Sequence, residues 1–153
     1  MPVSIRPLVE ADAATSVGWR NDPSIWRLTA SSPTREITLA DEVDWVRAVT
    51  SRADERRYAI ESDGVYVGNI YLTGIADDSA EYHVFIGDRR YLGRGIARAA
   101  SQLLLGVARE ELHLRSVRLS VKAHNERAVK LYGGLGFVPV DTHDGTIEME
   151  VIL

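Results

Sequence analysis

The stretch FIGDRRYLGRGIARAASQLLL, from Phe85 to Leu105, contains the clearest structural signals in the sequence. A short apolar run ends at Gly87, and an arginine-rich turn containing Gly93 and Gly95 follows it. A helical pattern then runs from about Gly95 to Glu111 with one apolar stripe, made of Ile96, Ala99, Ala100, Leu103, Leu104 and Val107. The stretch therefore predicts a strand, a glycine turn and a long helix, in that order.

The glycine turn has two readings from its residues alone. The first turn of a helix has free backbone N–H groups and a partial positive charge, and glycine lets a bulky anion approach the backbone closely. The segment YLGRGIA could thus bind a phosphate group, with Arg94 and Arg90 adding positive charge. A plain strand-to-helix turn would use glycine in the same way.

Residues around this unit alternate between strand and helix patterns. Strands are expected at residues 3–8, 58–62, 65–74, 80–87, 116–123, 137–143 and 146–153, with hairpin turns at Asp63-Gly64 and Asp144-Gly145. Further helices are expected at residues 9–20, 41–49 and 126–134. The unit from Tyr82 to Val121 is long enough for a right-handed parallel crossover. We predict an α/β fold with a mixed sheet, forming a single domain over residues 1–153.

Composition narrows the class of protein. The chain has 153 residues, 45% hydrophobic and 26% charged, with no cysteine and a net charge of -4. It therefore has no disulfide, thiol nucleophile or zinc-thiolate site, and its composition fits a reducing cytoplasm. We expect no nucleic-acid partner because the charge is negative, and no membrane association because no apolar run reaches about 20 residues. The first residues lack the pattern of a signal peptide.

Two nucleotide-binding motifs do not fit the glycine turn. A P-loop needs GxxxxGK followed by Ser or Thr, and the chain has no such run. The dinucleotide fingerprint needs GxGxxG, whereas here Gly93 and Gly95 are followed by Ile96, Ala97 and Arg98.

A downstream stretch, SVRLSVKAHNERAVKLYGGLGFVPV, resembles the C-terminal half of the GNAT superfamily of acetyl-CoA-dependent N-acetyltransferases. The residues that carry the resemblance are Asn125, Ala128, Leu131, Tyr132, Gly136 and Phe137. The region from Ala80 to Phe137 looks most like the branch of ribosomal-protein, spermidine and amino-sugar acetyltransferases. The early segments WRNDPSIW and DEVDW are similar to nucleotide-amino-sugar N-acetyltransferases.

In that family the turn reads Arg/Gln-x-x-Gly-x-Gly/Ala and holds the pyrophosphate of CoA. The letters fit from Arg90 to Gly95, but the register from Leu92 to Ala97 places the helix start better and is preferred. The resemblance then implies a backbone cradle made of Leu92, Gly93, Arg94, Gly95, Ile96 and Ala97. In this register leucine replaces the usual Arg/Gln.

The resemblance also implies direct acetyl transfer in a ternary complex. The pantetheine arm would add to the strand edge at Phe85, Ile86 and Gly87, where this strand and the next splay apart and Gly87 would permit the kink. Asn125 would bond the coenzyme arm, although a helix N-cap is an equal alternative. Tyr132 would be the general acid, whereas without the flanking motif it would be read as a core tyrosine.

Glu81 and His83 share one face of their strand and are the two candidates for the general base, with a solvated surface role as the alternative for each. The remaining histidines, His113, His124 and His143, lack metal-ligand spacing, and no metal is expected.

The acceptor pocket is expected in the N-terminal third, where Trp19, Arg20, Asn21 and Trp26 are candidates and Trp45 is a further one. Tryptophan in the core is the alternative. An amino sugar, free or nucleotide-linked, or a protein N-terminus is the expected acceptor, because no dense acidic cluster suits a polyamine. A homodimer is compatible with the resemblance. The alternative function is a non-catalytic CoA-binding sensor.

Overall fold

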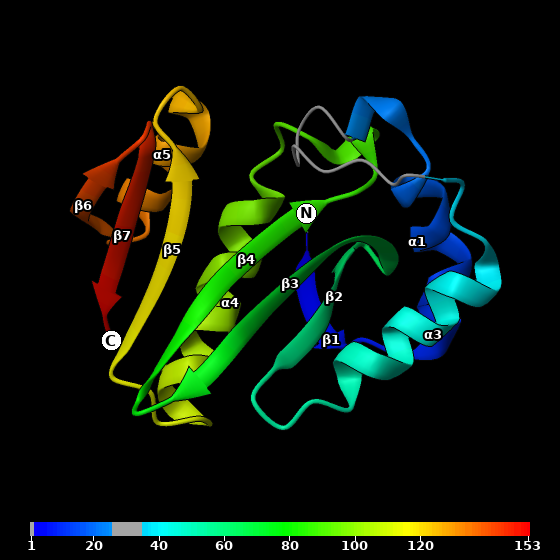
Figure 1. The fold of residues 1–153 in the computed structure, drawn as a ribbon, viewed down its shortest axis with the longest axis horizontal. Coiled ribbons are helices and arrows are strands. Elements are labelled where there is room, and N and C mark those ends of the chain that lie inside the picture. The colour runs from blue at the N-terminus through cyan, green and yellow to red at the C-terminus, as the bar shows by residue number, and fades with distance from the viewer. Residues whose placement is uncertain (1, 26–34) are drawn as a thin grey trace.

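A computed structural model describes residues 2–25 and 35–153 and shows one seven-stranded mixed sheet in the order β1-β2-β3-β4-β5-β7-β6 (Figure 1). The strands are β1 (Val3–Pro7), β2 (Arg56–Ser62), β3 (Val65–Ala76), β4 (Ser79–Ile86), β5 (Ser116–Lys122), β6 (Val138–His143) and β7 (Thr146–Ile152). All neighbouring strands are antiparallel except β4 and β5. The predicted mixed α/β sheet is confirmed.

The helices lie on both faces of this sheet. They are η1 (Glu10–Asp12), α1 (Ala13–Arg20), α3 (Leu39–Thr50), η2 (Arg89–Tyr91), α4 (Ile96–Glu110) and α5 (Glu126–Gly134). In Figure 1, α4 lies behind the sheet, whereas α1 and α3 lie beside β1 and β2. In the described part of the chain, no helix is long and apolar enough to cross a membrane.

Two apolar clusters follow from this arrangement. The larger cluster joins α4 to the sheet through Leu104, Ile70 and Phe137, and it extends to α5. The smaller cluster joins α1 and α3 to β1 and β2 through Ala13, Val46 and Ala59. Side chains of a strand alternate between faces, so β4 contributes Tyr82 to the larger cluster and turns Glu81 and His83 the other way.

The predicted hairpin turns are confirmed. Asp63 and Gly64 have φ of 51° and 80°, and Asp144 and Gly145 have φ of 48° and 74°. Both pairs therefore adopt the left-handed backbone that two-residue turns between antiparallel strands require.

The first predicted helix begins later than expected. Residues 10–12 form a 3-10 turn, and the α-helix starts at Ala13. The cause is Asp12, whose carboxylate accepts two hydrogen bonds from Arg6, at 2.9 and 2.7 Å, and one from the N–H of Val9 at 2.9 Å. This buried ion pair ties the start of α1 to β1.

The parallel pairing of β4 with β5 is short. Only Ser79, Ala80 and Glu81 pair with β5, opposite Ser116, Val117 and Arg118. Beyond Glu81 the two strands diverge, as the V between them in Figure 1 shows. The backbone of β4 from Tyr82 to Ile86 therefore has no strand partner on that side.

Phe137 should carry much of the stability beneath this V. It is 2% exposed, and its ring centroid lies 5.7 Å from that of Tyr82 and 6.1 Å from that of Tyr132. We expect Phe137→Ala to lower the free energy of unfolding by about 3–5 kcal/mol in urea titrations, because it leaves a cavity. Val138→Ala is the matched control, since Val138 is 57% exposed and should change stability by at most about 0.5 kcal/mol.

Candidate active site

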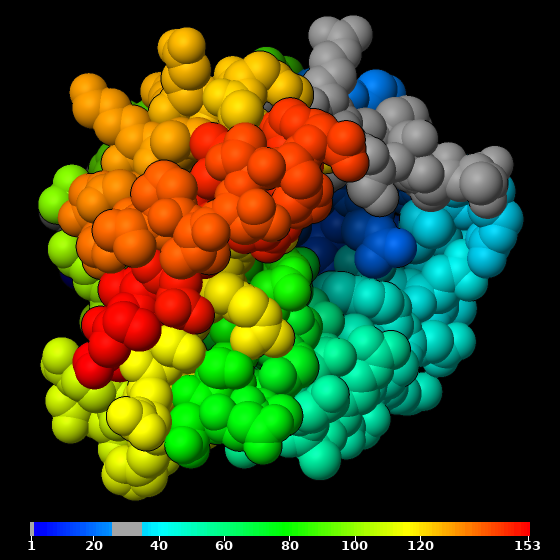
Figure 2. Space-filling view, turned by 60° about the vertical axis from the view of Figure 1, so that its left-hand side comes forward, coloured from blue at the N-terminus to red at the C-terminus, as the bar shows by residue number. Residues whose placement is uncertain are grey.

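The site is organised around the V between β4 and β5. Figure 2 shows β4 (green) flanked by the β6–β7 hairpin (orange to red) on one side and by α1 and α3 (blue to cyan) on the other. Unpaired peptide groups of a strand are a template for another extended chain, and the arm of CoA contains two amide groups that can take that part.

The turn before α4 forms a cradle of backbone donors. Gly93 and Gly95 have φ of 73° and 75°, a conformation that glycine adopts without strain. Gly95 is the N-cap and α4 begins at Ile96, so the helix starts where the preferred register puts it. Within the described residues, the backbone N–H groups of residues 93–98 form no hydrogen bond with a protein acceptor, so this run of donors is available to an anion.

The charges around the cradle differ from those expected. Nη2 of Arg90 donates to Oδ2 of Asp88 at 2.7 Å, so the Arg90 guanidinium forms an ion pair with that carboxylate. Arg94 does border the cradle, with its guanidinium 5.3 Å from the ring centroid of Tyr91.

Two further arginines escaped the sequence analysis. A β-carbon built on Gly93 would lie 3.3 Å from Nη2 of Arg127, so this residue of α5 reaches the cradle. Similarly, Nη1 of Arg98 lies 3.4 Å from a β-carbon built on Gly134, between α4 and α5. Both side chains stand in the first turn of their helix, and that placement was the signal in the sequence.

Asn125 has the capping role that was considered as an alternative. Its Oδ1 accepts from the N–H of Ala128 at 3.2 Å, at the start of α5. Its bond to the coenzyme arm remains a prediction.

Gly87 makes room for Trp19, and the kink expected at Gly87 remains a prediction. A β-carbon on Gly87 would lie 2.0 Å from Cδ2 of Trp19, so glycine is required to admit the indole. The N–H of Gly87 donates to the carbonyl of Val67 at 2.9 Å, which keeps the end of β4 on β3. Phe85 meets the Trp19 ring edge to face, with ring centroids 5.9 Å apart, while Ile86 packs against the larger cluster.

Tyr132 lies on the α4–α5 side of the V. Its ring meets Tyr82, the first residue of β4 beyond the paired segment, edge to face at 5.8 Å. Burial raises the pKa of the Tyr132 phenol above its usual value of 10.0. The hydroxyl of Tyr82 is hydrogen-bonded to that of Ser101, whereas the hydroxyl of Tyr132 has no hydrogen-bond partner among the described residues. Tyr132 therefore presents a protonated phenol at neutral pH.

Glu81 and His83 lie together on the opposite side of β4. Nε2 of His83 is 3.3 Å from Oε1 of Glu81 and 3.0 Å from Oγ1 of Thr73. Burial lowers the pKa of His83 below 6.5, against a smaller opposing effect of Glu81. The imidazole is therefore neutral at pH 7 and can accept a proton.

The expected substrate residues have different surroundings in the structure. Trp19 packs against Gly87, Phe85 and Tyr66, and its contact with the acceptor remains a prediction. Arg20 pairs with Glu42 at 3.4 Å and lies over the ring of Trp45 at 5.3 Å.

Asn21 is committed to the backbone. Its amide donates to the carbonyls of Val17 and Ile37 and accepts from the N–H of Ile37, which favours a structural role. Trp26 lies outside the described residues.

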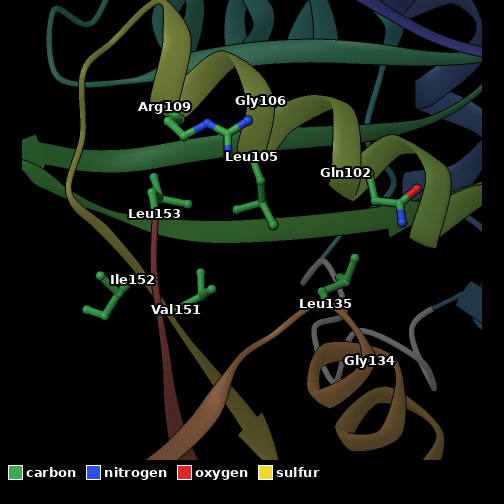
Figure 3. Close-up of a pocket in the computed structure, with 9 residues that line it drawn as sticks. All are labelled: Gln102, Leu105, Gly106, Arg109, Gly134, Leu135, Val151, Ile152 and Leu153. Carbon is green, nitrogen blue, oxygen red and sulfur yellow. The ribbon is translucent and has the colours of Figure 1, made fainter.

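A pocket of about 320 Å³ lies elsewhere, between α4, α5 and the end of β7 (Figure 3). Its lining is Gln102, Leu105, Gly106, Arg109, Gly134, Leu135, Val151, Ile152 and Leu153. It shares none of the predicted site residues. In the described part of the chain, no three His, Asp or Glu side chains gather in a way that could hold a metal ion.

Comparisons with known proteins agree with this geometry. A family model described as an acetyltransferase (GNAT) domain matches residues 3–138. The spermidine N(1)-acetyltransferase of Escherichia coli (strain K12) is 30% identical over 138 residues, which cover 88% of this chain and 72% of that protein.

Solved structures share the fold. The spermidine N-acetyltransferase of Vibrio cholerae in complex with CoA and spermine has a TM-score of 0.85 at 22% identity, covering 98% of this chain and 95% of that one. The PaiA N-acetyltransferase of Thermoplasma acidophilum in complex with coenzyme A has a TM-score of 0.78 at 19% identity, covering 100% of both chains.

The cradle can be tested with a matched pair of glycines. Gly95→Ala should weaken CoA binding in calorimetry by about tenfold or more, because a methyl group would stand where the anion approaches the backbone and φ would be strained. Gly145→Ala is the control, since Gly145 has nearly the same φ and the same open surroundings but lies in the β6–β7 turn.

Both variants should lose similar stability, and only Gly95→Ala should lose affinity. Equal affinity for CoA in the two variants would refute the cradle.

Proposed function

The chain belongs to the GNAT acetyltransferase family and is an acetyl-CoA-dependent N-acetyltransferase; from this premise we propose that its acceptor is a single primary amine on a molecule that is not a polycation. A protein N-terminus or an amino sugar, free or nucleotide-linked, meets this description. The observation that carries the proposal is the pairing of the carboxylates on the α1–α3 side of β4.

These carboxylates are already neutralised by arginine. Asp12 is held by Arg6 at 2.7 Å, and Glu55 is held by Arg57 at 2.7 Å. The buried Glu42 accepts from Ser16 at 2.6 Å and pairs with Arg20 at 3.4 Å. Among the described residues on this side, Glu81 has histidine as its partner instead. A chain of several ammonium groups would therefore find few free carboxylates.

The base also suits an amine of moderate basicity. A protein α-amine has a pKa of about 8, so about one molecule in ten is neutral at pH 7, whereas an alkylamine with a pKa near 10.4 is neutral in roughly one of 2,500. A proton acceptor such as His83, whose pKa lies below 6.5, works best on the first kind.

The residues divide the chemistry between the two sides of β4. Acetyl-CoA supplies an acetyl group activated as a thioester. The N–H groups of residues 93–98, with Arg94, Arg98 and Arg127, would hold its phosphates, and the free edge of β4 would hold its arm. Tyr132 would give a proton to the leaving sulfur, and the Glu81–His83 pair would take one from the amine.

Spermidine is the second candidate acceptor. The E. coli relative at 30% identity is a spermidine acetyltransferase by name. Glu150 of β7 also lies in register with Arg118, which in turn lies opposite Glu81. These carboxylates could bind one distal ammonium group.

Tyr132→Phe should lower kcat about 10²-fold or more, because the departing thiolate loses its acid, and should leave the Kd for CoA within about twofold. The wild-type rate should not fall through loss of this proton until the pH exceeds 10, since burial raises the pKa. Tyr58→Phe is the control, because burial also raises the pKa of Tyr58 but this residue of β2 lies away from the V. An unchanged kcat in Tyr132→Phe would remove Tyr132 from the mechanism.

Release of CoA thiol should be measured with glucosamine, a nucleotide-linked amino sugar, a short peptide with a free N-terminus, and spermidine. We expect kcat/KM for one of the first three to exceed that for spermidine by at least about tenfold, a difference of about 1.4 kcal/mol. Preference for spermidine would overturn the proposed acceptor class. Tight CoA binding with no release above hydrolysis would indicate the non-catalytic sensor.

A further inference from the structure

The side chain of His83 is fixed on more sides than a solvated histidine would be. The register of β3 on β4 sets Tyr71 opposite His83 and Thr73 opposite Glu81. The imidazole stacks on the Tyr71 ring at 4.7 Å with an interplanar angle of 14°. The guanidinium of Arg57 lies over the ring of Tyr71 at 3.9 Å, and Glu55 holds Arg57 at 2.7 Å.

Both polar neighbours of the imidazole meet the same nitrogen. Nε2 lies 3.0 Å from Oγ1 of Thr73 and 3.3 Å from Oε1 of Glu81. An ionised carboxylate only accepts hydrogen bonds, and a hydroxyl can accept one as well. If Nε2 carried a lone pair, it would face the carboxylate across 3.3 Å, which is repulsive. The neutral ring is therefore most stable with its proton on Nε2 and its lone pair on Nδ1.

We propose that Nδ1 of His83 accepts the proton from the acceptor amine, and that Glu81 and Thr73 are positioning residues that hold the ring proton on Nε2. This assignment rests on the proposed function of the site. It divides the roles of the two candidate bases: His83 takes the proton, and Glu81 orients the ring. Tyr71, with Arg57 behind it, keeps the plane of the ring along β4.

The proton balance is complete without a further reactant. The neutral amine nitrogen forms the new C–N bond and passes one proton to Nδ1, while the C–S bond breaks and the sulfur takes the phenolic proton of Tyr132. Solvent then carries a proton from the His83 imidazolium to the Tyr132 phenolate. The products are the N-acetylated amine and CoA thiol.

The charged groups around His83 set the direction of its pH dependence. They are Glu81 on β4, Arg57 on β2, Glu55 just before β2, and Arg118 on β5 opposite Glu81. Burial is the largest influence and lowers the pKa below 6.5, Glu81 raises it, Arg57 lowers it and Glu55 raises it. The rate should therefore be lost as the pH falls through a midpoint below 6.5. Removing the charge of Glu81 should move that midpoint lower still.

The tautomer can be read directly from ¹⁵N shifts of the four histidines in the resting protein, with His83→Gln used to assign the signals. We expect a protonated Nε2 and an unprotonated Nδ1 at pH 8. The His143–Glu148 pair is the internal control: it has the same 3.3 Å separation but is exposed on the β6–β7 hairpin. A proton on Nδ1 of His83, or an even mixture of tautomers, would overturn the positioning role.

The kinetic arm uses kcat/KM with the best acceptor. His83→Ala should lower kcat/KM about 10²-fold or more. Glu81→Gln should lower kcat/KM roughly tenfold and shift the acid midpoint of the pH–rate profile to lower pH. Thr73→Val should lower kcat/KM about fivefold, because one hydrogen bond to the imidazole is lost, while Thr73→Ser should keep kcat/KM within about twofold of the wild-type value. His143→Ala should match the wild type. A wild-type rate in His83→Ala would overturn the proposal.

Failure of the proposed function gives a different result. In that case spermidine gives the highest kcat/KM, and the tautomer and the His83→Ala rate can still be measured with spermidine as the acceptor. If turnover is normal but the tautomer or the His83→Ala rate disagrees, only the present inference fails.

Discussion

The early divergence of β4 from β5 determines how the site is built. Parallel strands normally pair along their length, and buried backbone groups without partners cost free energy. Here the pairing stops after Glu81, five residues before the end of β4 at Ile86. The molecule retains an unfilled strand edge in the middle of its sheet, and a peptide-like ligand can complete that edge.

The surrounding elements hold the V open. The larger cluster anchors β4 to α4 through Tyr82 and anchors β5 through Leu119, so each strand is fixed independently of the other. On the opposite face, Trp19 rests on the backbone of Gly87 and ties the end of β4 to α1. The V is thus formed before any ligand arrives, and binding need not reorganise the sheet.

Alternation along β4 then separates the two proton-transfer groups. Tyr82 faces Tyr132 in an apolar setting that keeps the phenol protonated, and burial raises its pKa accordingly. Glu81 and His83 face the polar side, where Thr73 and Tyr71 fix the imidazole. An acid and a base thus stand on either side of one strand, and the period of two in a β-strand is enough to place them there.

Local sequence signals predicted the strands, the hairpin turns and the start of α4, because turn residues and helix caps act within a few positions of themselves. Contacts that depend on strand register could not be predicted, because no local pattern near His83 indicates that Tyr71 lies beside it. Arg127 stands in the first turn of α5, which is a local signal, but its contact with the cradle depends on how α5 packs. The backbone hydrogen bonds of Asn21 could not be predicted either, because a polar residue at a helix end can bind a ligand or the backbone equally well.

Hydrogen exchange of the backbone amides, measured with and without CoA, tests whether the coenzyme binds to the glycine turn and to the free edge of β4. CoA should slow exchange in two separate segments, residues 93–98 and the unpaired amides of β4 between Tyr82 and Ile86, and leave the β6–β7 turn unchanged. Saturating binding of CoA with no protection in either segment would contradict this prediction.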